Sequence, residues 1–177
     1  MKRSVIMIMD GITKINKSMV WIMGALIAVV SVLLFVDVLL RYFFSSPTAW
    51  AFDLSTWSTG IIAFGLGGYA LAMGYHVRID LFFERFSRRH KCFVDLISAA
   101  FLFLMAITLI WLGMDYVIHY YQIDAMSSGG MGMPLWIQWL IVPAGGALIG
   151  LQGLVKVIND IYIIITGEEL YDAGEGQ

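Results

Sequence analysis

Charged residues are scarce in this sequence: Asp, Glu, Lys and Arg make up 14% of its 177 residues, whereas hydrophobic residues make up 60%. A soluble domain of this length carries about 25% charged residues. The mean hydropathy is +0.82, and so little charge could not cover the surface of a water-soluble fold. The composition therefore predicts an integral membrane protein with a single domain over residues 1–177.

Residues and motifs that carry chemistry are also scarce. The single cysteine, Cys92, excludes an intrachain disulfide and a cysteine-based zinc site. His76 and His119 are expected at opposite membrane surfaces, so they could not bind one haem together. Motifs of the GxSxG, HExxH, P-loop and dinucleotide-binding types are absent from the sequence. We therefore expect no catalytic residue, no metal and no cofactor, and the small, dispersed basic excess argues against nucleic acid as a partner.

Long runs without charge are abundant. They cover residues 18–36, 54–75, 96–114 and 125–155. About 20 residues of helix cross a hydrocarbon core of about 30 Å, and the last run is longer than one span because it begins with the glycine-rich segment 127–133. With flanking residues added, we expect four transmembrane helices, over about 15–44, 52–76, 93–120 and 134–160.

The distribution of Lys and Arg predicts the orientation of these helices. Ten of the eleven basic residues lie in the N-terminal segment, between the second and third spans, or after the fourth span, and only Arg41 lies on the other side. Basic residues favour the cytoplasmic side. Both termini are therefore expected in the cytoplasm, and the first helix is expected to be retained rather than cleaved.

The segment between the second and third spans has an amphipathic pattern. Its apolar residues recur at helical spacing, with polar residues on the opposite side; they are Ile79, Phe82, Phe83 and Phe86. The pattern predicts a short helix over about 79–90 that lies in the cytoplasmic interface. The alternative is an extension of the second span.

A few residues within the spans are candidates for structural contacts. Asp37 and Arg41 have the i, i+4 spacing of a helical ion pair; an anchor for the first helix is the favoured interpretation, and a contact to a partner protein is the alternative. Pro143 is expected to kink the fourth span. Gln138 and Gln152 are candidate hydrogen-bonding residues between helices.

Small residues in the fourth span predict close helix packing. Gly146 and Gly150 form a GxxxG pattern, which allows two helix backbones to approach each other in lipid. The neighbouring helix belongs either to this chain or to another subunit. The acids from Asp160 onward, including the acidic tail over about 166–177, are expected to be solvated.

Several sequence features together resemble the small membrane subunit of TRAP transporters, the DctQ-like family. After the long first helix comes a Trp and an acid at the start of the second span, here Trp50 and Asp53; the family more often has Glu at the second position. The further features are Gly68-Tyr69-Ala70-Leu71, His76-Val77-Arg78-Ile79-Asp80 and Met133-Pro134-Leu135-Trp136. The resemblance extends over nearly the whole chain.

The resemblance implies a multi-pass protein of the bacterial inner membrane that has no transport pathway of its own. Such a subunit pairs with a large multi-span subunit of the elevator type, which couples uptake of an organic acid to sodium. A periplasmic substrate-binding protein delivers the substrate. The remaining alternatives are a structural or anchor subunit of another inner-membrane complex, and an independent small carrier.

The resemblance also implies which residues make contacts. Partner or interface contacts are expected at Arg41, Trp50, Asp53, His76, Arg78, Asp80, Gly146 and Gly150. Contacts to membrane lipid headgroups are expected at Arg85, Arg88, Arg89 and Lys91. For the turn from His76 to Asp80, ordinary interfacial capping is an equally weighted alternative.

Overall fold

The computed structural model describes residues 2–46, 48–73, 88–168 and 170–171. These residues form six helices: α1 (Lys2–Phe44), α2 (Ala51–Gly65), α3 (Gly67–Ala72), α5 (Arg88–Gln122), α6 (Leu135–Trp139) and α7 (Ile141–Thr166). In the same ranges, the single extended contact is an isolated antiparallel bridge between Met126 and Pro134. The expected helix over 79–90 lies outside the described residues, apart from its last three residues, which begin α5.

Three segments of the described chain are long and apolar enough to cross a membrane. They are Arg3–Phe44, Val94–Gln122 and Leu135–Thr166, the last being α6 and α7 together. The expectation of an all-helical membrane protein is therefore confirmed. The second expected span is divided into α2 and α3, which adjoin at Leu66, and its crossing of the membrane remains a prediction.

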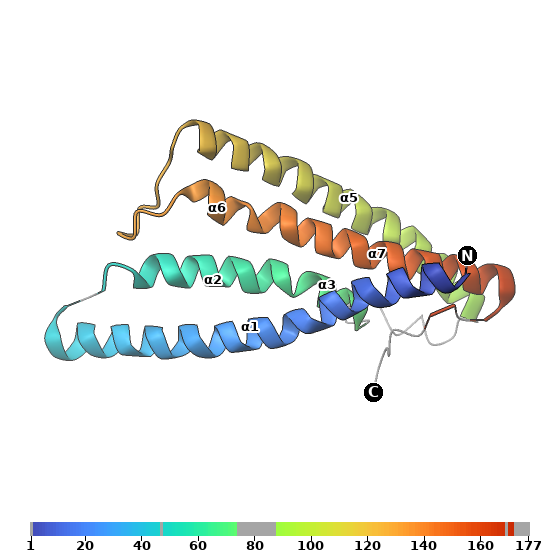
Figure 1. Ribbon diagram of the computed structural model, residues 1–177, viewed down its shortest axis with the longest axis horizontal. Helices are drawn as coiled ribbons and strands as arrows, with labels where there is room; N and C mark the ends of the chain where they lie inside the picture. Colours follow the sequence, from blue (N-terminus) through green and yellow to red (C-terminus); the bar gives the residue numbers. More distant parts are fainter. Residues whose placement is uncertain (1, 47, 74–87, 169, 172–177) are drawn as a thin grey trace.

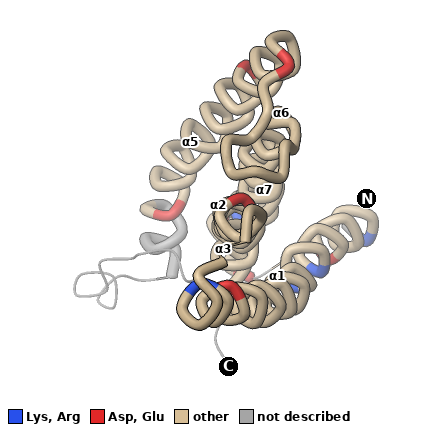
Figure 2. The backbone as a smooth tube through the Cα atoms, turned by 90° about the vertical axis from the view of Figure 1, so that its left-hand side faces the viewer, with Lys and Arg blue, Asp and Glu red and all other residues tan. Residues whose placement is uncertain are grey.

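The helices form a curved layer that is one helix thick (Figures 1 and 2). α7 packs against α5 on one side and against α2 and α3 on the other, and α1 packs against α2 and α3 and also contacts α7. In the described ranges α5 makes no extended contact with α1 or α2. Among the residues that the structure describes, the layer therefore leaves most of both broad faces uncovered, unlike a closed four-helix bundle.

The two ends of this layer differ. At one end, which we call the loop end, lie the connecting segments 45–50 and 123–134; at the other, the terminal end, α1 begins and α7 ends (Figure 1). Two helix pairs can be distinguished: α1 with α2, and α5 with α6–α7. The two pairs lie farther from each other at the loop end than at the terminal end (Figure 1). Toward the terminal end, α3, α5 and α7 meet in a small core of Leu71, Leu102 and Ile149.

Glycines allow α7 to lie close to both of its neighbours. A Cβ added to Gly145 would lie 2.5 Å from Cβ of Phe64 in α2, and one added to Gly146 would lie 3.0 Å from Cβ of Leu109 in α5. Gly150 also faces α5, 3.6 Å from Cβ of Ala106. The GxxxG neighbour is thus a helix of the same chain, which is one of the two alternatives that the sequence left open.

The expected irregularity in the fourth span is present at the junction of α6 and α7. α6 ends at Trp139, and α7 begins at Ile141, two residues before the buried Pro143. Proline has no N–H to donate to the carbonyl four residues earlier, which here belongs to Trp139. The helix is interrupted where this hydrogen bond is missing.

α1 contacts the rest of the chain along one narrow seam. Every seventh residue from Met9 to Asp37 is buried: Met9, Asn16, Met23, Val30 and Asp37. A seven-residue repeat is the signature of left-handed packing between helices. The remaining circumference of α1 is largely exposed, and Trp21, for example, is 82% exposed.

Candidate functional site

Asp53 binds the segment 123–134 to the start of α2. Its side chain lies in the first turn of α2 and is 2% exposed. The backbone N–H of Met131 donates to its Oδ2 at 3.0 Å, and the hydroxyl of Ser127 donates to its Oδ1. A carboxylate is also favoured near a helix N-terminus, where the backbone N–H groups are unpaired. Asp53 therefore connects two segments that are far apart in the sequence.

Gly129 completes this contact. A Cβ added to Gly129 would lie 2.1 Å from Oδ1 of Asp53, well inside van der Waals contact. The backbone N–H of Gly129 also donates to Oγ of Ser127 at 3.3 Å. The segment thus closes over the carboxylate because no side chain intervenes at this position.

Asp37 binds the segment between α1 and α2 to the last turns of α1. It is 3% exposed, and Nη2 of Arg41 lies 2.9 Å from its Oδ2. Its Oδ1 accepts the backbone N–H of Thr48 at 2.8 Å, and it also accepts the hydroxyl of Thr48. The expected Asp37–Arg41 pair is confirmed, and Thr48 is a partner that the sequence pattern did not reveal.

Aromatic side chains join α5 to α6 at the loop end. The ring of Trp139 stacks on Tyr116 with centroids 4.5 Å apart and on Tyr120 with centroids 5.7 Å apart. Tyr121 and Trp136 meet edge to face at 5.8 Å. Such rings are favoured at the boundary between lipid and water, so this cluster marks an interfacial level of the layer.

A cluster of buried polar side chains joins α1 to α7 toward the terminal end. Nδ2 of Asn16 donates to Oε1 of Gln152 at 3.1 Å, and Nε2 of Gln152 donates to Oγ1 of Thr13 at 3.3 Å. The expected role of Gln152 between helices is thereby confirmed. Asn16 also lies directly against α3, because a Cβ added to Gly68 would be 1.9 Å from its Oδ1.

Ion pairs and hydrogen bonds add further contacts at the terminal end. Nζ of Lys156 in α7 lies 3.3 Å from Oδ2 of Asp95 in α5, and both side chains are mostly buried. The backbone N–H groups of Leu170 and Tyr171 each donate to Oδ1 of Asn159 at 3.1 Å. Sequence reasoning missed these contacts, since each joins residues with no local pattern to connect them.

The segment after α7 returns to α1. The hydroxyl of Tyr171 donates to Oδ1 of Asp10 at 3.3 Å, and burial raises the pKa of Tyr171 above its usual value. The expectation that the acids from Asp160 onward are solvated is wrong for Asp160 itself, which is 7% exposed. Within the acidic tail over about 166–177, residues 169 and 172–177 lie outside the described residues.

The expected contact residues fall into distinct groups. Arg41, Trp50 and Asp53 all lie at the loop end, where Arg41 is exposed, Trp50 is half-buried and Asp53 is buried. His76, Arg78, Asp80 and Arg85 lie outside the described residues, as do the side chains of Arg88, Arg89 and Lys91 in the first turn of α5. In the described part of the chain, no cluster of three or more His, Cys, Asp or Glu residues could hold a metal ion.

Long apolar helices and a family match together define the class of the protein. The fold is that of an integral membrane helical protein, and residues 30–162 match the family model "Tripartite ATP-independent periplasmic transporters, DctQ component". The match covers well over half of the chain, which therefore belongs to the DctQ family, the small membrane components of TRAP transporters. This is a family of transporter components, not of enzymes. No curated protein and no solved structure matches the chain.

Proposed function

We propose that this chain pairs with a large multi-span TRAP subunit in the bacterial inner membrane and serves as its fixed scaffold. The family match is the observation that carries the proposal. In it, α1, α2–α3, α5 and α6–α7 form four spans, both termini are cytoplasmic, and the loop end faces the periplasm. The large subunit carries out sodium-coupled uptake of an organic acid that a periplasmic binding protein delivers.

The arrangement of polar groups supports a scaffold role. The buried side chains of Asp37, Asp53, Asn16 and Gln152 form hydrogen bonds within the chain, so each holds two segments of the layer together. Ion-coupled carriers place ionisable groups along a path through the membrane. We therefore assign the substrate and sodium sites to the large subunit.

The exposed surface of α1 supports pairing with another membrane protein. Its large exposed apolar side chains include Trp21, Ile22, Val29, Val32, Phe35, Tyr42 and Phe43. A moving transport domain needs a stationary surface to move against, and a layer with two uncovered faces widens that surface. At the loop end, Arg41 and Trp50 are the proposed contacts to the binding protein.

Affinity purification of the tagged chain from native membranes in mild detergent, followed by mass spectrometry, tests the pairing. We expect a large polytopic membrane protein at a ratio near one to one. Recovery of redox subunits would instead indicate an anchor subunit of another complex. Recovery of this chain alone, with uptake activity in liposomes, would indicate an independent carrier.

The segment that follows α3 provides a second test. We expect the double variant Arg78→Ala with Asp80→Ala to lower complex yield or uptake while membrane insertion is unchanged. The control is Arg3→Ala with Glu175→Ala, which removes one charge of each sign elsewhere. Normal complex yield and uptake in the first variant would contradict the proposed contact.

Orientation is tested with reporters. A periplasm-active enzyme fused after Arg89 should be silent, because the segment between the second and third spans is proposed to be cytoplasmic. The same enzyme inserted after Ser128, in the segment 123–134, should be active. The reverse pattern would overturn the proposed topology.

A further inference from the structure

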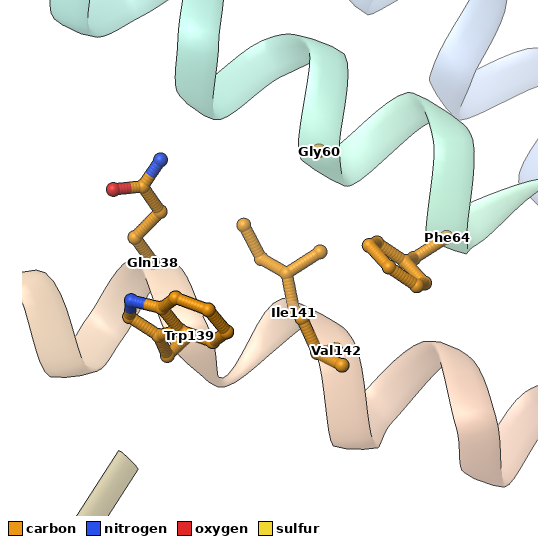
Figure 3. A pocket seen from close by; sticks show the side chains of 6 residues that line it. All are labelled: Gly60, Phe64, Gln138, Trp139, Ile141 and Val142. Carbon is orange, nitrogen blue, oxygen red and sulfur yellow. The ribbon is translucent and has the colours of Figure 1, made fainter. Parts of the chain in front are cut away.

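A cavity of about 240 Å³ separates α2 from the junction of α6 and α7 (Figure 3). It is open to its surroundings, and its lining consists of Gly60, Phe64, Gln138, Trp139, Ile141 and Val142. An apolar cavity of about 150 Å³ is already large enough to bind benzene. The cavity therefore has room for a segment of hydrocarbon chain.

The lining has an apolar body and one polar end. Phe64 lies at one end of the cavity, and Gln138 and Trp139 of α6 lie at the other (Figure 3). The side-chain amide of Gln138, a half-buried residue, is a polar group at this end of the lining. An amide N–H at the edge of an apolar space is stabilised by a hydrogen-bond acceptor. A ligand with a hydrocarbon chain and an acceptor group at one end would match both features.

The position of the cavity in the layer limits what can fill it. The cavity is open rather than enclosed, and it lies between α2 and the apolar segment Leu135–Thr166, which is long enough to cross a membrane. An empty space would deprive its lining of dispersion contacts, and an apolar lining disfavours water. Lipid hydrocarbon chains surround an integral membrane protein, so they are available to fill this cavity.

The polar end lies at the correct level for a lipid ester group. Trp139 belongs to the aromatic cluster with Tyr116 and Tyr120, and such rings settle near the headgroups. We propose that the cavity binds one acyl chain of a phospholipid from the leaflet at the loop end, with the amide of Gln138 donating to the ester carbonyl. The lipid fills the space between α2 and α6–α7 where these helices spread apart.

Native mass spectrometry of the full chain, purified in mild detergent and titrated with palmitoyl-oleoyl-phosphatidylethanolamine, tests the proposal. Gly60→Leu directs a side chain into the cavity, because a Cβ added there meets only Cδ1 of Ile141, at 3.9 Å. Gly24→Leu is the matched control, since a Cβ added to Gly24 in α1 meets nothing within 4 Å. Gln138→Leu removes the polar contact but leaves most of the space.

We expect wild type and Gly24→Leu to retain one tightly bound lipid, and Gly60→Leu to bind it at least tenfold more weakly. Gln138→Leu should bind it severalfold more weakly, which keeps the proposal testable if Gly60→Leu does not fold. Equal lipid retention in wild type and both cavity variants would overturn the proposal. So would a wild-type chain that retains no lipid, a result that would assign the cavity to a side chain of another subunit.

Discussion

Replacing Asp53 by Ala should release the segment 123–134 from α2. The change removes the acceptor for two donors, the N–H of Met131 at 3.0 Å and the hydroxyl of Ser127. A hydrogen bond to a charged group contributes about 1.5–3 kcal/mol. Using the lower figure for each bond, opening of the segment becomes easier by about 3 kcal/mol, which is about two orders of magnitude in the opening equilibrium.

Hydrogen exchange followed by mass spectrometry measures this effect, because exchange of protected amides reports local opening. In Asp53→Ala, peptides that cover 123–134 should lose about a hundredfold in protection, while peptides from α7 are unchanged. Asp53→Asn keeps the shape and one carbonyl oxygen, so about a tenfold loss is expected. The exposed neighbour Ser128 provides the control, and Ser128→Ala should exchange as wild type does. If Asp53→Ala and Ser128→Ala exchange alike, Asp53 does not hold this segment.

Two further substitutions test the packing between helices, and both are measured by thermal unfolding in detergent. Gln152→Leu removes one of the two acceptors of the buried Asn16 amide, Oε1 of Gln152 at 3.1 Å, and leaves the carbonyl of Ile12 at 3.2 Å. It should lower the free energy of unfolding by about 1–3 kcal/mol, and an unchanged midpoint would mean that the lost bond contributes nothing. Gly145→Ala places a methyl group 2.5 Å from Cβ of Phe64, so it should lower the free energy of unfolding by about 1–3 kcal/mol. Gly24→Ala is the control, because the space around Gly24 is open. It should be neutral or raise the free energy of unfolding by up to about 1 kcal/mol. Equal effects of the two alanines would contradict the close approach of α2 and α7.

Contacts between residues close in the sequence could be predicted, and contacts across the layer could not. Asp37 and Arg41 are one helical turn apart, so their pairing follows from helix geometry alone. Met131 is 78 residues from Asp53, and Gln152 is 136 residues from Asn16. These pairs depend on which helices pack against each other, and the positions of the apolar runs in the sequence do not reveal that.

The seam of α1 was also hidden in the sequence, for a reason specific to membranes. In water, a buried helix face stands out because the exposed face is polar. In lipid both faces are apolar, so the exposed Trp21 and Val32 are as hydrophobic as the buried Met23 and Val30. The seven-residue repeat of buried positions emerges only from the packed structure.

The division of the second span at Leu66 has a related cause. The glycines on either side of Leu66 contact side chains of other helices. A Cβ added to Gly65 would lie 3.2 Å from Sδ of Met23 in α1, and one added to Gly67 would lie 2.6 Å from Cδ1 of Ile149 in α7. Glycine is a poor helix former, and its presence here serves these close contacts. The sequence shows these glycines but does not reveal the interruption between α2 and α3.

In the described part of the chain, which forms a layer one helix thick, few residues are screened from the surroundings by a second layer of protein atoms. The molecules that cover the two faces, whether acyl chains, detergent or another subunit, therefore act as part of the core. Free energies of unfolding measured for this chain belong to the chain together with its covering. A substitution on a broad face of the layer will have one effect in a micelle and a different effect in an assembled complex.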